Sequence, residues 1–209
     1  MLLSEAESSV LLSHATALMP LIDNHLNKLN LTASDLNAVS VSSGPGSYTG
    51  LRIGVSTAKG ICHALNIPLI SVGSLHAAAW GLKELSGAAG SDLLIPLIDA
   101  RRMEAFAAIY DSTLKEVRAP HPWIFDVESM DEFGDVRLFL GGSGAAKLKE
   151  MFADRDNVLF IDNELHRASF SCKIAFDKFC NSVFESTAYF EPDYGKDFVP
   201  GKPVVKGLK

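Results

Sequence analysis

Residues 38–72 read AVSVSSGPGSYTGLRIGVSTAKGICHALNIPLISV, and this stretch decides the fold. Its first residues alternate small and β-branched side chains, which is typical of a short strand, and a glycine-rich turn follows at residues 44–50. A helix is predicted over Thr49–Leu65 and a second strand over Ile67–Val72, because asparagine and proline end the helical pattern between them. Strand, helix and strand in this order predict two parallel strands joined by a right-handed crossover.

The flanking segments continue the alternation of helices and strands. Apolar residues spaced by three and four predict an amphipathic helix from Val10 to Leu29 that contains Pro20. Thr32 with Asp35 predicts a capping box, and Ser74 begins another helix. Further on, the pattern predicts strands over Leu93–Ile98, Glu104–Tyr110, Val136–Leu140 and Val158–Ile161, and helices over Ala145–Phe152 and through Phe170, Ile174, Phe179 and Val183. The first two of these strands are expected to pair as a hairpin.

The composition is that of an ordinary folded chain, with 47% hydrophobic and 21% charged residues among 209. A stretch of Gly, Ala and Ser at residues 86–91 is the predicted boundary between two lobes. We therefore predict an α/β protein with a first lobe at residues 1–90 and a second lobe at residues 91–190. Residues 191–209 are expected to form an extended tail.

Charge and cysteine content exclude several classes of protein. The net charge of −6 argues against a chain that binds a nucleic-acid backbone unaided, since such binding requires a basic face. The cysteines, Cys62, Cys172 and Cys180, contain no C-x-x-C pair. This excludes a disulfide framework and a thiolate zinc site, and fits a reducing cytosol. No run is long and apolar enough to span a bilayer, so we predict no membrane contact.

Small residues form two rows on the helix predicted over Thr49–Leu65. The members of each row are four positions apart; one row is Gly50, Gly54 and Ala58, and the other is Ser56, Gly60 and Ala64. Glycine inside a helix costs roughly 1 kcal/mol relative to alanine, so each row predicts a close neighbour. One row suffices for packing on the sheet, and the second favours another packing partner, such as another chain.

Glycine-rich turns are candidate anion or nucleotide sites, because backbone N–H groups at a helix N-terminus attract negative charge. The turn at residues 44–50 has the spacing G-x-G-x-x-x-G and lacks the lysine of a P-loop, so a structural turn is favoured there. The turn at residues 141–144, with Asp162 and His166 downstream, resembles a hydrolase elbow, but Ala145 stands in place of its last glycine. That turn can equally receive a nucleotide base or simply reverse the chain.

Two arginines, Arg101 and Arg102, stand at the tip of the predicted hairpin. They either contact phosphate or a partner, or they belong to a solvated turn. The tail lysines Lys202, Lys206 and Lys209 are too few for a nucleic-acid site on their own, but they could add to one that a partner builds.

The stretch at residues 41–60, VSSGPGSYTGLRIGVSTAKG, closely resembles the bacterial tRNA threonylcarbamoyladenosine biosynthesis family TsaB, also called YeaZ. The segments IPLISV at residues 67–72 and IDARRME at residues 98–104 support the resemblance, as do KDFV at residues 196–199 and KGLK at residues 206–209. The match covers most of the chain, and the string GPGSYTGLRIG is specific. The resemblance implies a two-lobed nucleotide-binding fold of the actin/sugar-kinase/heat-shock type (ASKHA).

The resemblance also implies cytoplasmic work as the non-catalytic partner of the related enzyme TsaD, with the small ATPase TsaE joining them. Together they transfer threonylcarbamoyl to the adenosine beside the tRNA anticodon, so tRNA is reached only through the complex. The chain itself would carry no catalytic residue and require no cofactor, while ATP or ADP is expected at the complex. A homodimer is expected when the partner is absent. The alternative is an ATP-using or hydrolytic enzyme of the same fold that acts alone.

The expected absence of a metal site has two sources. The catalytic relative carries a metal-binding H-x-x-x-H pair after its equivalent of Val72, and those positions hold Ser74 and Ala78 in this chain. Histidine spacing agrees, because His14 and His25 lie eleven positions apart and so do not share a helix face at ligand spacing.

Partner contacts in the family come from a bundle of the first two helices, which are here the predicted helices Val10–Leu29 and Thr49–Leu65. This agrees with the rows of small residues. The residues expected at the contact are Leu11, Leu18, Met19, Ile22, Arg52, Gly54, Val55 and Ala58. The residues expected to face a nucleotide are Gly44, Gly46, Ser47, Gly141 and Gly142.

The chain departs from the family at its start. The family begins with a strand and a hairpin that carry an Asp-Thr-Ser turn facing nucleotide phosphate, and no such segment precedes Leu2. Either the start of the chain is misassigned, or the chain is truncated, or this member has lost the N-terminal strands of the fold; of these we expect truncation. A core strand without its neighbour would expose backbone groups. The gap also weakens the expectation that this chain binds ATP in the ordinary way.

Overall fold

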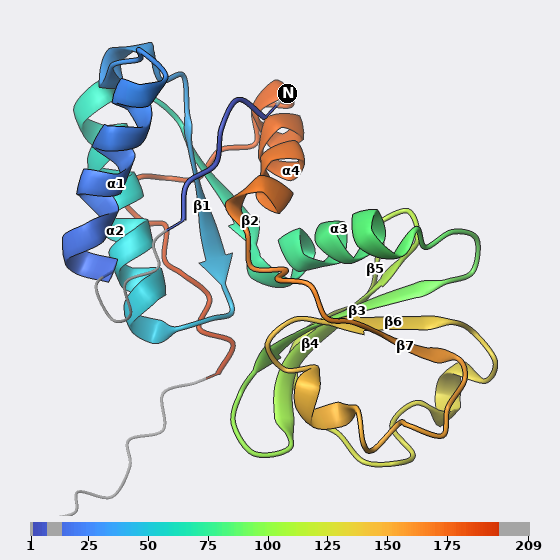
Figure 1. The fold of residues 1–209 in the computed structure, drawn as a ribbon. Helices are drawn as coiled ribbons and strands as arrows, with labels where there is room; N and C mark the ends of the chain where they lie inside the picture. Colours follow the sequence, from blue (N-terminus) through green and yellow to red (C-terminus); the bar gives the residue numbers. More distant parts are fainter. Residues whose placement is uncertain (1, 8–13, 197–209) are drawn as a thin grey trace, which may run out of the picture.

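The computed structural model describes residues 2–7 and 14–196, which form two β-sheets surrounded by helices (Figure 1). The smaller sheet pairs β1 (Val39–Gly44) with β2 (Leu69–Gly73), and α2 (Tyr48–Leu65) connects the two strands. The strands are parallel. The predicted strand–helix–strand unit is therefore confirmed.

The larger sheet contains five strands: β3 (Leu93–Asp99), β4 (Glu104–Asp111), β5 (Glu116–Ile124), β6 (Leu138–Gly141) and β7 (Val158–Ile161). Their order is β5-β4-β3-β6-β7, so β5 and β7 are the edges. β3 and β4 form the predicted antiparallel hairpin, and β6 and β7 continue the sheet parallel to β3. Sequence patterns missed β5 because Pro120 and Pro122 interrupt it, and an edge strand tolerates proline.

Both faces of the larger sheet are buried, as alternation along β3 shows. Ile95 and Leu97 point into one cluster, while Leu94 and Ile98 point into the other, which packs against α3 (Ser74–Ser86). Burying each such side chain contributes about 1.5–3 kcal/mol. The larger sheet therefore buries the apolar side chains of both its faces within the chain.

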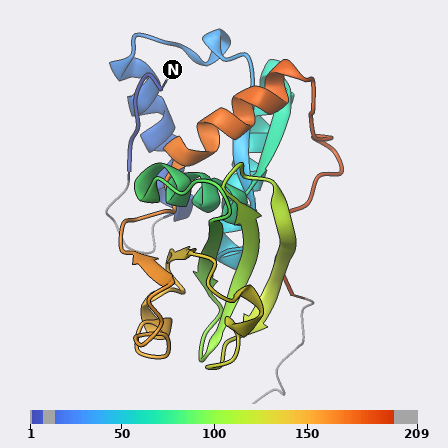
Figure 2. The same cartoon turned by 90° about the vertical axis from the view of Figure 1, so that its right-hand side faces the viewer.

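Helices cover opposite faces of the smaller sheet (Figures 1 and 2). Leu69 of β2 packs toward α2, whereas Ile70 and Val72 pack toward α4 (Ala168–Cys180). α1 (His14–Lys28) lies beside α2, on the side away from α4. Since α1 contacts mainly α2, these two helices form an outer wall of the molecule.

The chain returns to the smaller sheet after α4. The Glu185 N–H donates to the carbonyl of Leu69 (2.8 Å), and the Lys59 ammonium donates to the carbonyls of Ala188 and Phe190 (3.3 and 3.0 Å). Residues 197–209 lie outside the described residues. The lobe boundaries at residues 90 and 190 stay a prediction.

Three local predictions have clear outcomes. The capping box is confirmed, because Asp35 accepts a hydrogen bond from the Thr32 N–H (2.7 Å) at a single 3₁₀ turn, Ala33–Asp35. The helix predicted over Ala145–Phe152 is wrong. Only Ala146–Leu148 forms a 3₁₀ turn, because backbone bonds there span three residues rather than four. A further 3₁₀ turn covers Asp131–Phe133.

Candidate functional site

The inner face of α2 holds the helix on the smaller sheet. Leu51, Val55, Ala58 and Cys62 are buried, and Ala58 and Cys62 pack with Leu69 of β2. Val55 and Ala58 are each 4% exposed. The expectation that these two residues face a partner is therefore corrected, because both side chains are buried and Ala58 packs against Leu69 of the sheet.

The outer face of α2 is exposed along a row that contains Arg52, Ser56 and Gly60. A side-chain carbon added at Gly60 would meet no atom within 4 Å. Nothing in the described residues therefore requires glycine there, although glycine inside a helix costs about 1 kcal/mol. Sequence reasoning identified this row but did not name Ser56 or Gly60 as contact residues. In the sequence, the apolar residues Leu51 and Val55 indicate which face of the helix packs inside the protein.

The remaining expected contact residues lie around this outer wall. Gly54 is half-buried, and a carbon added there would lie 3.6 Å from Val41 Cγ2, which is an ordinary contact. On α1, Leu18 and Ile22 are half-buried, and Met19 is 49% exposed. Leu11 lies outside the described residues. Arg52 and Met19 are thus the expected contact residues that the structure leaves exposed.

Contacts at the start of α2 orient Arg52. The Ser47 hydroxyl caps the helix by accepting the Gly50 N–H (3.3 Å). Arg52 Nη1 donates to the Tyr48 hydroxyl (3.2 Å), and the Tyr48 ring packs 4.7 Å from the ring of Tyr194. The guanidinium is thereby held at the N-terminal end of the outer face.

A cleft of about 610 Å³ lies between the two sheets. Gly46 and Ser47 line it on the side of the smaller sheet, and Ser143 lines it on the side of the larger sheet. The Ser42 and Ser74 hydroxyls, 2.6 Å apart, join β1 to the start of α3 along its wall. Two of the residues expected to face a nucleotide therefore line this cleft, and nucleotide binding there stays a prediction.

The other glycines expected at a nucleotide pack inside the chain. Gly44 has φ +108°, and a carbon added there would lie 1.9 Å from the Asp193 carbonyl oxygen. Gly142 has φ +102°, and a carbon added there would lie 2.4 Å from the Leu97 carbonyl oxygen. Gly141 is buried. None of the three is among the residues that line the cleft, and backbone or core atoms pack against these positions; their expected role at a nucleotide stays a prediction.

The hydrolase-like turn does not assemble a catalytic arrangement. Ser143 Oγ accepts the Asp99 N–H (3.1 Å), and Asp162 pairs with the Lys149 ammonium (2.5 Å). Among residues 2–7 and 14–196, no hydrogen bond connects Ser143, Asp162 and His166. The same residues hold no group of three or more His, Cys, Asp or Glu side chains placed to bind a metal, and no helix able to cross a membrane.

His76, which lies between the positions of the relative's metal ligands, has a structural contact instead. Its ring stacks on Tyr110 with the centroids 5.3 Å apart. Burial, with a smaller contribution from the Lys178 ammonium, lowers the pKa of His76, so the imidazole is neutral at pH 7. The neutral ring packs α3 on β4.

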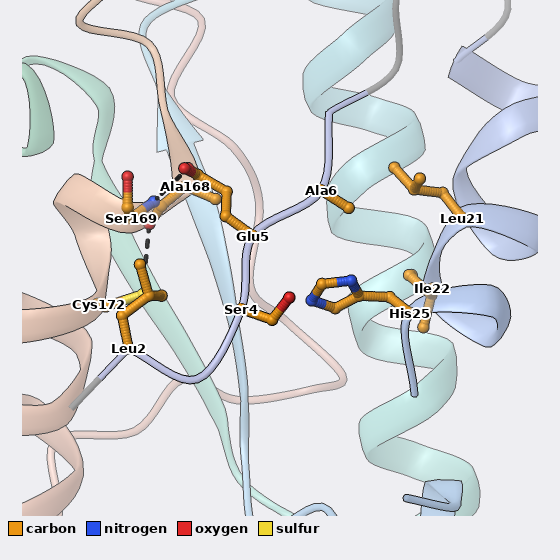
Figure 3. Close-up of a pocket in the computed structure, with 10 residues that line it drawn as sticks. All are labelled: Leu2, Ser4, Glu5, Ala6, Leu21, Ile22, His25, Ala168, Ser169 and Cys172. Atoms are coloured by element: carbon orange, nitrogen blue, oxygen red, sulfur yellow. Dashed lines mark hydrogen bonds between the residues drawn. The ribbon is translucent and has the colours of Figure 1, made fainter. Parts of the chain in front are cut away.

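Residues 2–7 lie between α4 and α1 (Figure 3). Glu5 pairs with Arg167 and accepts the Ser169 N–H (3.1 Å), so its carboxylate caps the start of α4. These hydrogen bonds, that from Arg167 first, hold the pKa of Glu5 below its usual range. A small, mostly apolar cavity of about 200 Å³ lies beside this segment, between Leu21 and Cys172. The segment therefore links α1 to α4.

Comparison with known proteins identifies the family. The family model described as "TsaD: tRNA N6-adenosine threonylcarbamoyltransferase" matches residues 9–185. The chain belongs to the TsaD family. The relatives of this TsaD-family chain narrow the resemblance further.

Curated relatives of this TsaD-family chain carry the name "tRNA threonylcarbamoyladenosine biosynthesis protein TsaB". The protein from Bacillus subtilis is 37% identical over 98 residues, and the one from Escherichia coli is 33% identical over 97. These alignments cover 47% and 46% of this chain and 41% of each relative, so the chain matches about two-fifths of the relatives' length. The resemblance to TsaB is confirmed.

Solved structures show the fold. "YeaZ from Pseudomonas aeruginosa" superposes with a TM-score of 0.72 at 23% identity, covering 90% of this chain and 86% of that one. A second structure, titled as an uncharacterized protein with similarity to peptidase YEAZ from Pseudomonas aeruginosa, gives 0.71 at 21% identity, with 88% and 84% covered. The predicted α/β fold of the ASKHA type is confirmed for this TsaD-family chain.

Proposed function

We propose that this chain is a binding subunit of the tRNA threonylcarbamoyladenosine system. It docks the outer wall of α1 and α2 on a TsaD-type catalytic homologue and leaves the chemistry to that partner. Family membership and the TsaB relatives support the assignment of the chain to this system, and the structure supports the choice of the α1 and α2 face for docking.

The observation that carries this proposal is Gly60. It lies inside an 18-residue helix and is exposed, and no atom of the described residues would lie within 4 Å of a side-chain carbon added there. A glycine without an internal reason favours a helix backbone that is approached closely from outside. Arg52 at one end of the same face offers a charged anchor, and arginine is a residue type enriched at interface hot spots.

The position of Ser74 supports a non-catalytic role. Where the resemblance places a metal-binding histidine of the catalytic relative, the Ser74 hydroxyl is hydrogen-bonded to Ser42. Ala78, at the second ligand position, is fully buried. Neither side chain can serve as a strong metal ligand, so the chemistry is assigned to the partner.

The remaining partners follow from the same assignment. A TsaE-type ATPase and tRNA join through the complex, in the cytoplasm, and ATP or ADP binds at the complex rather than being required by this chain. A second copy of the chain occupies the α1 and α2 wall when the catalytic homologue is absent.

The test is binding of the TsaD-type homologue by calorimetry. Gly60→Leu fills the outer face and is expected to weaken binding roughly tenfold or more, since close approach at an interface centre is lost. Lys173→Leu is the matched control, because it adds a leucine to an exposed position of α4 and removes only a surface ion pair. Equal affinity of Gly60→Leu and wild-type chains, with both folded, contradicts the proposed face.

A second candidate function is a hydrolase acting alone. It is favoured by one structural neighbour, which is described as similar to a peptidase, and by Ser143 and His166, which line the same cleft. The purified chain would then cleave peptides or esters, and Ser143→Ala would abolish that turnover. Turnover that Ser143→Ala leaves unchanged would point to a contaminating enzyme.

A further inference from the structure

The tip of the β3–β4 hairpin holds two adjacent arginines in an unusual backbone conformation. The φ angle is +72° at Arg101 and +51° at Arg102, in the left-handed region that residues with side chains rarely adopt. The turn is closed by hydrogen bonds from the Ala100 N–H to the Glu104 carbonyl (3.1 Å) and from the Glu104 N–H to the Arg101 carbonyl (3.2 Å). Glycine or asparagine would adopt this turn at lower cost, so the two arginine side chains are kept despite strain.

The guanidinium groups of this tip also differ from the others in the chain, which has seven arginines. The other five each contact an acid or a tyrosine: Arg52 with Tyr48, Arg118 with Glu132, Arg137 with Asp92, Arg155 with Asp131 and Arg167 with Glu5. Within the described part of the chain, the side chains of Arg101 and Arg102 have no hydrogen bond or ion pair, and both residues are exposed.

The acids beside the tip are already neutralised. Asp99 pairs with the Lys147 ammonium (2.5 Å), and Glu104 pairs with Lys196. Among the described residues, four cations therefore lie near two carboxylates, which gives this corner an excess of two positive charges on a chain whose net charge is −6. This corner is locally basic on an acidic protein.

We propose that the Arg101–Arg102 tip binds the phosphate backbone of RNA, namely the tRNA of the modification system, which rests on the proposed function. Guanidinium groups bind phosphate oxygens in a bidentate manner and stack on unpaired bases, which an ammonium group does not. Asp99, at the base of the tip, is hydrogen-bonded to Ser143 of the cleft wall. RNA bound at the tip lies beside the mouth of the cleft between the sheets.

The experiment titrates an unmodified tRNA transcript with adenosine beside the anticodon. Fluorescence anisotropy is read at several KCl concentrations, for the full chain alone and for its complex with the TsaD-type homologue. In the double variant Arg101→Ala with Arg102→Ala, affinity is expected to fall about tenfold near 0.1 M salt. The slope of log affinity against log salt is expected to shrink by about 1 to 2, because up to two phosphate contacts are lost.

Two further variants exclude a merely structural effect. Arg101→Gly with Arg102→Gly relieves the strained backbone, so it keeps or raises the melting temperature but loses tRNA affinity like the alanine variant. Lys115→Ala is the control for loss of a positive charge elsewhere on the surface, because Lys115 is exposed at the opposite end of β4. This control is expected to leave the salt slope unchanged.

The proposal is overturned if the double alanine variant keeps wild-type affinity and slope, or if Lys115→Ala loses as much. Loss of homologue binding with unchanged tRNA affinity would assign the tip to protein contact and also overturn it. So would a tip that binds ATP but not tRNA. Binding of the homologue is measured separately by calorimetry. A wild-type complex that fails to form contradicts the proposed function, whereas a complex that forms and whose tRNA affinity the arginine variants leave unchanged contradicts this proposal alone.

Discussion

The larger sheet and the outer wall of the smaller one use glycine for opposite purposes. Gly142, which follows β6, has φ +102° and would place a side-chain carbon 2.4 Å from the Leu97 carbonyl oxygen. At Gly60, on α2, a side-chain carbon would meet no atom of residues 2–7 and 14–196 within 4 Å. The first glycine is explained within the chain and therefore says nothing about partners. The second has no internal reason, and this is what directs attention to the outer face.

The strongest test of this contrast is Gly142→Ala. The new carbon meets backbone that cannot move freely, and the residue must adopt a disfavoured φ, so we expect a loss of about 3–5 kcal/mol in the free energy of unfolding. Urea unfolding followed by circular dichroism measures it.

Gly87→Ala separates the two causes of that loss. Gly87 ends α3 with φ +67° but has no atom within 4 Å of the added carbon, so only the backbone cost of about 1 kcal/mol is expected. If Gly142→Ala costs no more than Gly87→Ala, the close packing around the larger sheet is not what selects glycine there.

A smaller effect is expected at Asp92, a buried carboxylate beside the larger sheet whose hydrogen bonds all come from within the chain. Burial raises the pKa of Asp92, but the Ala89 N–H (2.9 Å) and the Arg137 guanidinium (2.6 and 2.9 Å) outweigh it and lower the pKa below its usual value. Asp92→Asn is expected to lose about 1–3 kcal/mol at pH 7, because a buried, charge-assisted network is broken.

The pH dependence of that loss follows from the direction of the shift. A carboxylate with a lowered folded pKa stabilises the fold above its unfolded pKa, and this contribution disappears as the pH falls through the folded value. The difference between wild-type and Asp92→Asn chains should therefore be full at neutral pH and shrink in acid, below the ordinary aspartate range. Asp177→Asn, in an exposed pair with Lys173, should change stability by less than about 0.5 kcal/mol at any pH. A pH-independent loss at Asp92 would show that shape rather than charge matters there.

Much of the fold could be predicted because local signals agreed with tertiary needs. Residues 38–72 carry alternation, helical spacing and helix-ending residues in the right order, and β7 was predicted with its exact bounds. β5 could not be predicted, since its stability comes from pairing with β4 at a sheet edge rather than from its proline-interrupted sequence. Ala145–Phe152 has helical spacing, yet tighter turns satisfy its backbone.

The candidate site was predicted only in outline. The two rows on α2 were visible in the sequence, but which row faces the sheet depends on the apolar residues beside it, and Val55 and Ala58 were assigned to the wrong face. Gly44 and Gly142 looked like nucleotide loops because a glycine carries no sign of what packs against it. That information exists only once Asp193 and Leu97 are brought close by the fold.

The smallest effect bears most directly on the outer wall. Gly60→Ala adds a methyl group to open space and removes the backbone entropy cost of glycine, so the free energy of unfolding should rise by about 0.5–1 kcal/mol. Gly81→Ala, on α3, is the matched control, because its added carbon would lie 2.8 Å from the Phe170 ring and should lower stability instead. Urea unfolding of both variants, followed by titration with the TsaD-type homologue, gives the decisive pair of signs. If Gly60→Ala is more stable than the wild-type chain yet binds the homologue more weakly, the wild-type glycine serves a neighbour outside the chain. If Gly60→Ala is less stable, position 60 has a contact within the chain, and Gly60 no longer supports docking through this face.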